Sequence, residues 1–197
     1  SAIESELRKS GKHAIVAAGH SNEQSEKDGI EFLIDRNCDA LIMLVDALPN
    51  DYFIELSKKK TPFTVLNRQI PEIDHHCFYL NNELGGYLAT KHLIDNGHTN
   101  IAYISGTLNK QDATDRFNGH QRALQEAKLE HDNDLLFEGD FLIQSGRDGM
   151  TALINKKRPF TAVACANDEM AGGAMKAVRE QGLAIPKDYS IIGFDNV

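Results

Sequence analysis

Polar, charged and small residues follow many of the short apolar runs of this chain, in a mixture that suits a polyhydroxylated ligand. Carboxylates and amides can exchange hydrogen bonds with vicinal hydroxyls, Arg offers a planar set of donors, and an aromatic ring can cover the C–H face of a sugar. Ligands of open parallel sheets bind in the crevice beyond the carboxyl ends of the strands, so these positions form a candidate site. They are Gly19, His20, Asp46, Asn67, Arg68, Gly106, Arg116, Asp140, Phe141, Asn167, Asp168, Asp195 and Asn196.

Motifs of phosphate binding and of nucleophilic catalysis are absent from the sequence. It contains no G-x-x-x-x-G-K-[ST], no G-x-G-x-x-G and no G-x-S-x-G. His75 and His76 precede Cys77, but no carboxylate or further His at helical spacing joins them, so we interpret them as solvated loop histidines. We therefore expect a binding protein with no enzymatic activity, no cofactor and no metal.

Each candidate residue also has a structural explanation that the sequence leaves open. Asn167 and Asp195 are residue types that cap a following helix, and for Asn167 taken alone capping is the favoured interpretation. Arg116 follows Asp115, which suggests a surface ion pair or an N-cap, and Phe141 could belong to a core.

Strand-like and helix-like segments alternate along the chain. The helix-length segment Asn22–Asp35 has apolar residues at three- and four-residue spacing, as does Asn82–Asn96, where Gly97 supplies a stop. Strands separated by helices predict an α/β fold with doubly wound parallel sheets. The expected strands are His13–Ala18, Ala40–Val45, Phe63–Leu66, Cys77–Leu80, Ile101–Ser105, Leu135–Glu138, Thr161–Cys165 and Ser190–Phe194.

One junction breaks this alternation and divides the chain into two expected lobes. Between Phe63–Leu66 and Cys77–Leu80 the sequence reads NRQIPEIDHH, which is too polar and proline-interrupted for a helix. We expect a first lobe over residues 1–80 and a second lobe over residues 81–197. The chain starts on a helix, Ala2–Ser10, with no strand ahead of it, and stops three residues after its last strand, so we expect a fragment.

The composition predicts an ordinary cytoplasmic protein. Of 197 residues, 41% are hydrophobic and 25% charged, the net charge is −8, and no apolar stretch approaches the ~20 residues that span a bilayer. The basic runs Lys58–Lys60 and Lys156–Arg158 are typical of solvated helix C-termini, where cations are favourable. Because DNA binding requires clustered cations, we do not expect this chain to bind DNA by itself. Cys38, Cys77 and Cys165 have no zinc or disulfide spacing and read as small buried hydrophobes.

Three segments resemble the LacI/galactose-repressor family of bacterial transcriptional regulators. The stretch NNELGGYLATKHLIDNGHTNIAYISGT resembles the family's helix that ends in "GH" before the second lobe's first strand. The motif DRFNGHQRAL is similar to its R-x-x-G helix start. The run FTAVACANDEMAGGAMKAVREQGLAIPKDYSIIGFDNV matches the family's N-D-x-M-A-x-G-A-M … G-[FY]-D signature almost throughout. With the NEQSEKDGIEFLIDRNCDALIM region, the resemblance covers essentially the whole chain and is closest to galactose repressors.

This resemblance implies a fold, a ligand and partners. It implies a type I periplasmic-binding-protein-like fold, a homodimer, and a small sugar effector, galactose or a related sugar, in the cleft between the lobes. Operator DNA would be bound only through an N-terminal helix-turn-helix outside this chain, and the family's first strand and C-terminal crossover also lie outside it. The implied effector contacts are Asn67, Arg68, Asp112, Arg116, Phe141, Asn167 and Asp195, with Lys110 as a weaker one.

Two other functions would use the same architecture. A sugar-binding protein of an ABC importer would also hold a sugar between two lobes, but it needs an export signal, and none is visible. A sugar-processing α/β enzyme would need a nucleophile, a base or a cofactor loop.

Overall fold

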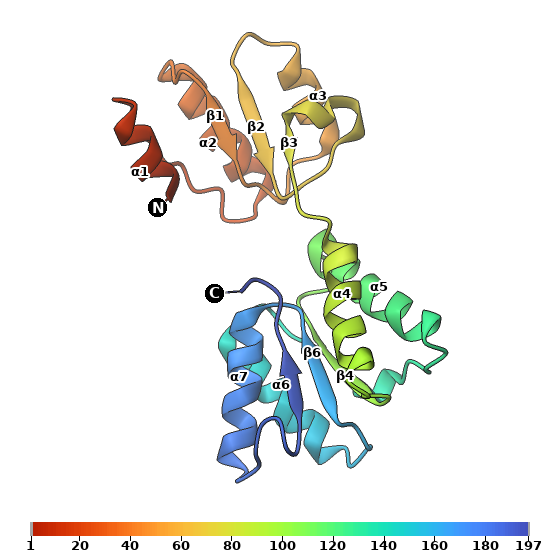
Figure 1. Ribbon diagram of the computed structural model, residues 1–197. Coiled ribbons are helices and arrows are strands. Elements are labelled where there is room, and N and C mark those ends of the chain that lie inside the picture. The colour runs from red at the N-terminus through yellow and green to blue at the C-terminus, as the bar shows by residue number, and fades with distance from the viewer. Residues whose placement is uncertain (1, 197) are drawn as a thin grey trace. The chain divides into compact units, whose positions relative to one another are not determined.

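The computed structural model describes residues 2–196 and shows helices alternating with short parallel strands (Figure 1). The chain separates after Leu80 into two compact units, lobe 1 up to Leu80 and lobe 2 from Asn81 onward. Every strand pair in both lobes is parallel, which confirms the predicted α/β class. No helix within residues 2–196 combines the length and apolar character that crossing a bilayer requires.

Lobe 1 is built on a three-stranded sheet in the order β1-β2-β3. Its core lies between this sheet and its helices, and the fully buried Phe53 and Val65 are part of it. Asn22 caps α2 by accepting a hydrogen bond from the Ser25 N–H at 3.0 Å. The elements are α1 (Ala2–Lys9), α2 (Glu23–Asp35), β1 (Leu41–Met43), α3 (Asn50–Ser57), β2 (Phe63–Leu66), the 3-10 helix η1 (Pro71–His76) and β3 (Cys77–Phe78).

Lobe 2 is built on a four-stranded sheet in the order β5-β4-β6-β7. Helices α4 and α5 pack together on one side of the sheet, and α6 and α7 pack together on the other (Figure 1). All residues of β4 and β6 are buried, as expected for central parallel strands covered on both faces. The elements are α4 (Asn82–Asp95), β4 (Ile101–Ser105), α5 (Gln111–Glu126), η2 (Asn133–Leu135), β5 (Leu136–Glu138), α6 (Ile143–Asn155), β6 (Ala162–Cys165), α7 (Asp168–Glu180) and β7 (Ser190–Ile192).

Three predictions about lobe 1 and the cysteines were wrong. His13–Ala18 is not a strand: Ile15 and Val16 are exposed, and no strand among the described residues is hydrogen-bonded to this run. An apolar run forms a strand only where a neighbouring strand satisfies the hydrogen-bonding groups of its backbone.

The junction that was expected to lack a helix contains η1. Pro71 has a fixed φ that suits a first helical turn, and the side chain of Ile73 is buried in the core of lobe 1. Of the three cysteines only Cys165 is buried, while the other two are half-buried.

A histidine on α5 is enclosed in the core of lobe 2. His120 has no exposed surface, its Nδ1 lies 2.9 Å from Thr90 Oγ1, and its Nε2 has no hydrogen-bond partner among the described residues. The rings of Tyr103 and His131 lie against it, with centroids 4.6 and 6.0 Å away. Burial, and to a lesser degree the neighbouring His131, lowers the pKa of His120 from its ordinary 6.5 to about 3.

We therefore predict that His120 makes lobe 2 sensitive to acid. Because the unfolded chain binds a proton that the folded protein excludes, the stability present above pH 6.5 is lost as the pH falls toward 3, by about 1.4 kcal/mol per pH unit. The variant His120→Phe should lose this part of the slope. Urea unfolding between pH 7 and pH 4 measures it, with the exposed His92→Phe on α4 as the control. Equal slopes for the wild type and His120→Phe would contradict the prediction.

Candidate functional site

The guanidinium of Arg116 connects three separate segments at the carboxyl end of the lobe 2 sheet. Arg116 lies in the second turn of α5 and is only 6% exposed. Its Nε donates to Asn82 Oδ1 at the start of α4, at 2.9 Å, and its Nη1 donates to the carbonyl of Ala166 just after β6, at 2.6 Å. Asp195, which follows β7, places its Oδ1 3.9 Å from Nη1. The surface pair of Arg116 with Asp115 that the sequence left open is not what forms.

The surroundings of Arg116 compensate for burying its charge. An isolated buried cation is strongly unfavourable, and hydrogen bonds together with an opposite charge offset that cost. The ring of Phe194 lies 3.8 Å from the guanidinium carbon, a close cation–π contact, and the ring of Phe141 lies 6.0 Å away. The Asp195 side chain is 37% exposed, so the ion pair has one buried and one solvated member. Among the described residues no hydrogen bond engages Nη2 of Arg116.

Two glycines bring α4 close enough to α5 for the Asn82 contact. A Cβ on Gly86 would overlap the carbonyl of Arg116, and a Cβ on Gly119 would overlap the carbonyl of Glu83. The backbones of the two helices are therefore in close contact at Arg116 and again at Gly119, which fixes the point from which the Arg116 side chain extends.

Asn167 has two structural roles at once. Its Oδ1 caps α7 by accepting from the Met170 N–H at 2.9 Å, as the structural interpretation of this residue predicts. Its Nδ2 donates to the carbonyl of Phe141 at 2.8 Å. Phe141 has a φ of +71° and rests its ring directly against Gly106, where any side chain would collide with it. The amide of Asn167 thus helps to hold Phe141 at the edge of the site.

Two further predicted contacts lie near the start of α5. Asp112 occupies the first turn, four residues before Arg116, so the two residues share a helix face. Its Oδ1 accepts from the Ala113 N–H at 2.9 Å. Lys110 is the N-cap residue of the same helix, and its carbonyl accepts from the Thr114 N–H.

The predicted contacts of lobe 1 lie just after β2. Asn67 is exposed and has a φ of +59°, and its N–H donates to the Phe78 carbonyl at 2.7 Å. Arg68 donates from Nη1 to the Leu48 carbonyl and from Nη2 to Asn50 Oδ1, both at 2.6 Å. Arg68 is therefore tied to the loop after β1, whereas Asn67 presents its side chain to solvent. Their role as effector contacts stays a prediction.

A buried carboxylate shapes the same loop of lobe 1. Glu26 on α2 is 4% exposed and accepts hydrogen bonds of 3.0 to 3.2 Å from the N–H groups of Asp46, Ala47 and Leu48. Sequence reasoning missed Glu26, because a Glu in the first turn of a helix is typically an exposed residue. Asn82 and Phe194 were also missed, because their contacts are with Arg116, which is distant from both in the sequence.

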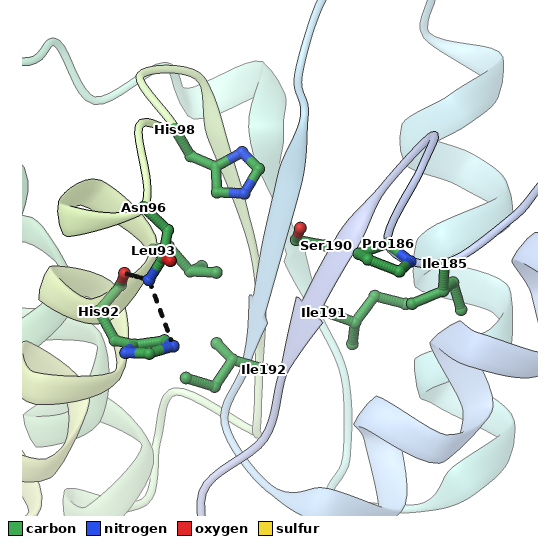
Figure 2. A pocket seen from close by; sticks show the side chains of 9 residues that line it. All are labelled: His92, Leu93, Asn96, His98, Ile185, Pro186, Ser190, Ile191 and Ile192. Carbon is green, nitrogen blue, oxygen red and sulfur yellow. Dashed lines mark hydrogen bonds between the residues drawn. The ribbon is translucent and has the colours of Figure 1, made fainter.

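Lobe 2 also has a separate groove at the amino end of its strands, lined by described residues (Figure 2). It has a volume of about 530 Å³ and lies between the last turn of α4, with His92 and Leu93, and β7, with Ser190 and Ile191. Ser190 begins β7 and Asp195 follows its end, so this groove lies at the amino end of the strands, away from Arg116. Residues 2–196 contain no group of three or more His, Cys, Asp or Glu residues arranged to hold a metal ion.

Comparison with known proteins gives a consistent set of relatives. The model of the periplasmic binding protein-like domain family matches residues 90–197. The HTH-type transcriptional regulator GalR of Salmonella typhimurium LT2 is 37% identical over 196 residues, which are 100% of this chain and 57% of GalR. The HTH-type transcriptional repressor PurR of Aliivibrio salmonicida is 34% identical, over 99% of this chain and 59% of PurR. The chain thus spans less than two thirds of the length of these relatives.

A solved structure shows the same architecture. A sugar-binding transcriptional regulator of the LacI family from Escherichia coli, crystallised with phosphate, superposes with a TM-score of 0.88 and 29% sequence identity. The superposition covers 98% of this chain and 73% of that chain.

The contacts of Arg116 predict a measurable stability cost for losing the guanidinium. Arg116→Lys leaves one ammonium group in place of the two nitrogens that now bond Asn82 and Ala166, so a buried acceptor loses its partner. We expect the free energy of unfolding to fall by about 1–3 kcal/mol in urea titrations without ligand. The control is Arg122→Lys, on the same helix but half-exposed, with an expected change within about 0.5 kcal/mol. Equal stability of wild type and Arg116→Lys would show that the buried contacts contribute nothing.

Proposed function

Because this chain belongs to the periplasmic-binding-protein-like family, and within it to the LacI family of transcriptional regulators, we propose that it is the effector-sensing core of a cytoplasmic repressor. We further propose that its effector is a small neutral sugar, with D-galactose as the leading candidate. The whole protein would be a homodimer that binds operator DNA through an N-terminal helix-turn-helix, and sugar binding would modulate that contact.

The observation that carries this proposal is the pairing of Arg116 with Asp195 at the carboxyl end of the lobe 2 sheet. One partner supplies hydrogen-bond donors and the other supplies acceptors, and the rings of Phe141 and Phe194 lie close to the guanidinium. Neighbouring hydroxyls of a sugar need this combination of donor, acceptor and apolar face.

The charges at this edge favour a neutral ligand over a phosphorylated one. The positive charge of Arg116 is already balanced by Asp195, and Asp112 and Asp140 add negative charge near the same strand ends. Hydrogen bonds from Ser145 and from the Leu142 backbone lower the pKa of Asp140, so that this carboxylate is ionised at neutral pH. A phosphate would meet these three carboxylates, which outnumber the two cations near the start of α5, Arg116 and Lys110.

A calorimetric screen of the whole protein tests the ligand class. Neutral monosaccharides, nucleosides and phosphosugars are titrated under the same conditions. We expect binding by a neutral sugar, D-galactose in the first place, and recovery of the sugar unchanged by mass spectrometry, because we propose no catalytic turnover. Binding by only a nucleoside or a phosphosugar, or heat-sensitive conversion of the sugar, would refute the proposal.

The role of Asp195 gives a sharper prediction. Asp195→Asn keeps the size and the capping ability of the side chain but removes the charged acceptor. A hydrogen bond to a charged group contributes ~1.5–3 kcal/mol, so the affinity for D-galactose should fall roughly ten- to a hundred-fold. Because Asp195 is 37% exposed and its ion pair with Arg116 spans 3.9 Å, the melting temperature without sugar should fall only slightly, whereas the upward shift on adding sugar should shrink or vanish.

The matched control is Asp148→Asn, an exposed carboxylate on α6 that accepts from Gln144. This variant should bind D-galactose as the wild type does. A wild-type response to sugar in Asp195→Asn would mean that Asp195 is not a ligand contact.

A further inference from the structure

The first residue of α7 reaches the segment that follows β7. Asp168 Oδ1 accepts a hydrogen bond of 2.8 Å from the backbone N–H of Phe194. The hydrogen-bonded ladder between β6 and β7 ends at Ile192, so it does not extend to this amide. Among the described residues, the Asp168 carboxylate is the hydrogen-bond partner of the Phe194 N–H.

Gly193 makes this reach possible. A Cβ built on Gly193 would overlap Asp168 Oδ1, so any other residue would push the carboxylate away from the Phe194 amide. The contact therefore depends on one residue at each end, an acidic acceptor on α7 and a glycine just after β7.

The segment that Asp168 holds carries two groups of the proposed effector site. The Phe194 ring lies between the Arg116 guanidinium, 3.8 Å away, and Gly85 of α4, where a side chain would displace it. Asp195 is the next residue, and its Oδ1 lies 3.9 Å from Arg116. Fixing the Phe194 peptide therefore fixes both the aromatic cover of Arg116 and its charge partner.

From this geometry we propose that Asp168 is a positioning residue, whose carboxylate holds the turn at Gly193 and Phe194 so that Asp195 can receive a sugar hydroxyl. The inference rests on the proposed function and deepens it. Together with Asn167, whose amide holds the Phe141 carbonyl, Asp168 makes the N-terminus of α7 the support of the groups on both sides of β6.

A simpler role for Asp168 is stabilisation of the N-terminal end of α7 by its negative charge. Glu169 shares that role, since it lies in the same first turn, but it is exposed and makes no contact with Phe194 among the described hydrogen bonds. The variants Asp168→Ala and Glu169→Ala therefore remove equal charge from the same helix end, and only the first removes the acceptor.

The test combines amide hydrogen exchange with the affinity of the whole protein for D-galactose. In Asp168→Ala we expect the Phe194 amide to exchange at least ~10-fold faster and the affinity to fall on the order of ten-fold. Asp168→Asn keeps an oxygen acceptor and should restore most of both values, while Glu169→Ala should match the wild type in both. Gly193→Ala should reproduce the Asp168→Ala result and serves where Asp168→Ala does not fold.

Three results would overturn the inference. They are an unchanged Phe194 exchange rate in Asp168→Ala, faster exchange with wild-type affinity, or an equal loss of affinity in Glu169→Ala. A wild-type protein that binds no sugar would refute the proposed function instead, and the exchange rate of Phe194 would still show whether Asp168 holds the turn.

Discussion

The buried guanidinium of Arg116 is the constraint on which the carboxyl end of lobe 2 depends. A cation at 6% exposure requires hydrogen-bond acceptors and a counter-charge, and no single segment of this chain supplies them all. Asn82 comes from the start of α4, Ala166 from the end of β6, and Asp195 from the segment after β7. The close crossing of α4 and α5 at Gly86 and the hydrogen bond between Asp168 and Phe194 are what allow these partners to meet. Helix packing and charge compensation in lobe 2 thus both involve the Arg116 side chain.

The two arginines predicted to contact the effector are held in different ways. Arg68 bonds the loop after β1 through Nη1 and the first residue of α3, Asn50, through Nη2. Glu26 fixes the same loop through three consecutive backbone amides. Arg116 uses Nε and Nη1, and it pairs with an Asp195 that remains 37% exposed. Arg68 therefore stabilises the loop structure of lobe 1, whereas the carboxylate paired with Arg116 stays partly exposed to solvent. This difference makes lobe 2 the stronger basis for the proposed sugar site.

The sequence predicted the α/β class, the parallel strands of lobe 2 and the relationship to LacI-type regulators, because each rests on a local pattern or an unbroken motif. It failed at His13–Ala18, since a strand depends on a partner that an apolar run does not reveal. The strand-end positions pointed to Arg116 and Asp195, and the structure brings these two side chains to within 3.9 Å of each other. The roles of Glu26, Asn82 and Asp168 were not predictable, because each is defined by a contact with a residue at least 20 positions away.

The central claim is that Arg116 and Asp195 act on the effector as one unit. A double-mutant cycle measures this directly: the affinity for D-galactose is determined for the wild type, Arg116→Lys, Asp195→Asn and the double variant of the whole protein. If the two side chains form one binding unit, the double variant should lose little more affinity than the more damaging single variant. Losses that simply add, or single variants that bind D-galactose as the wild type does, would contradict the account.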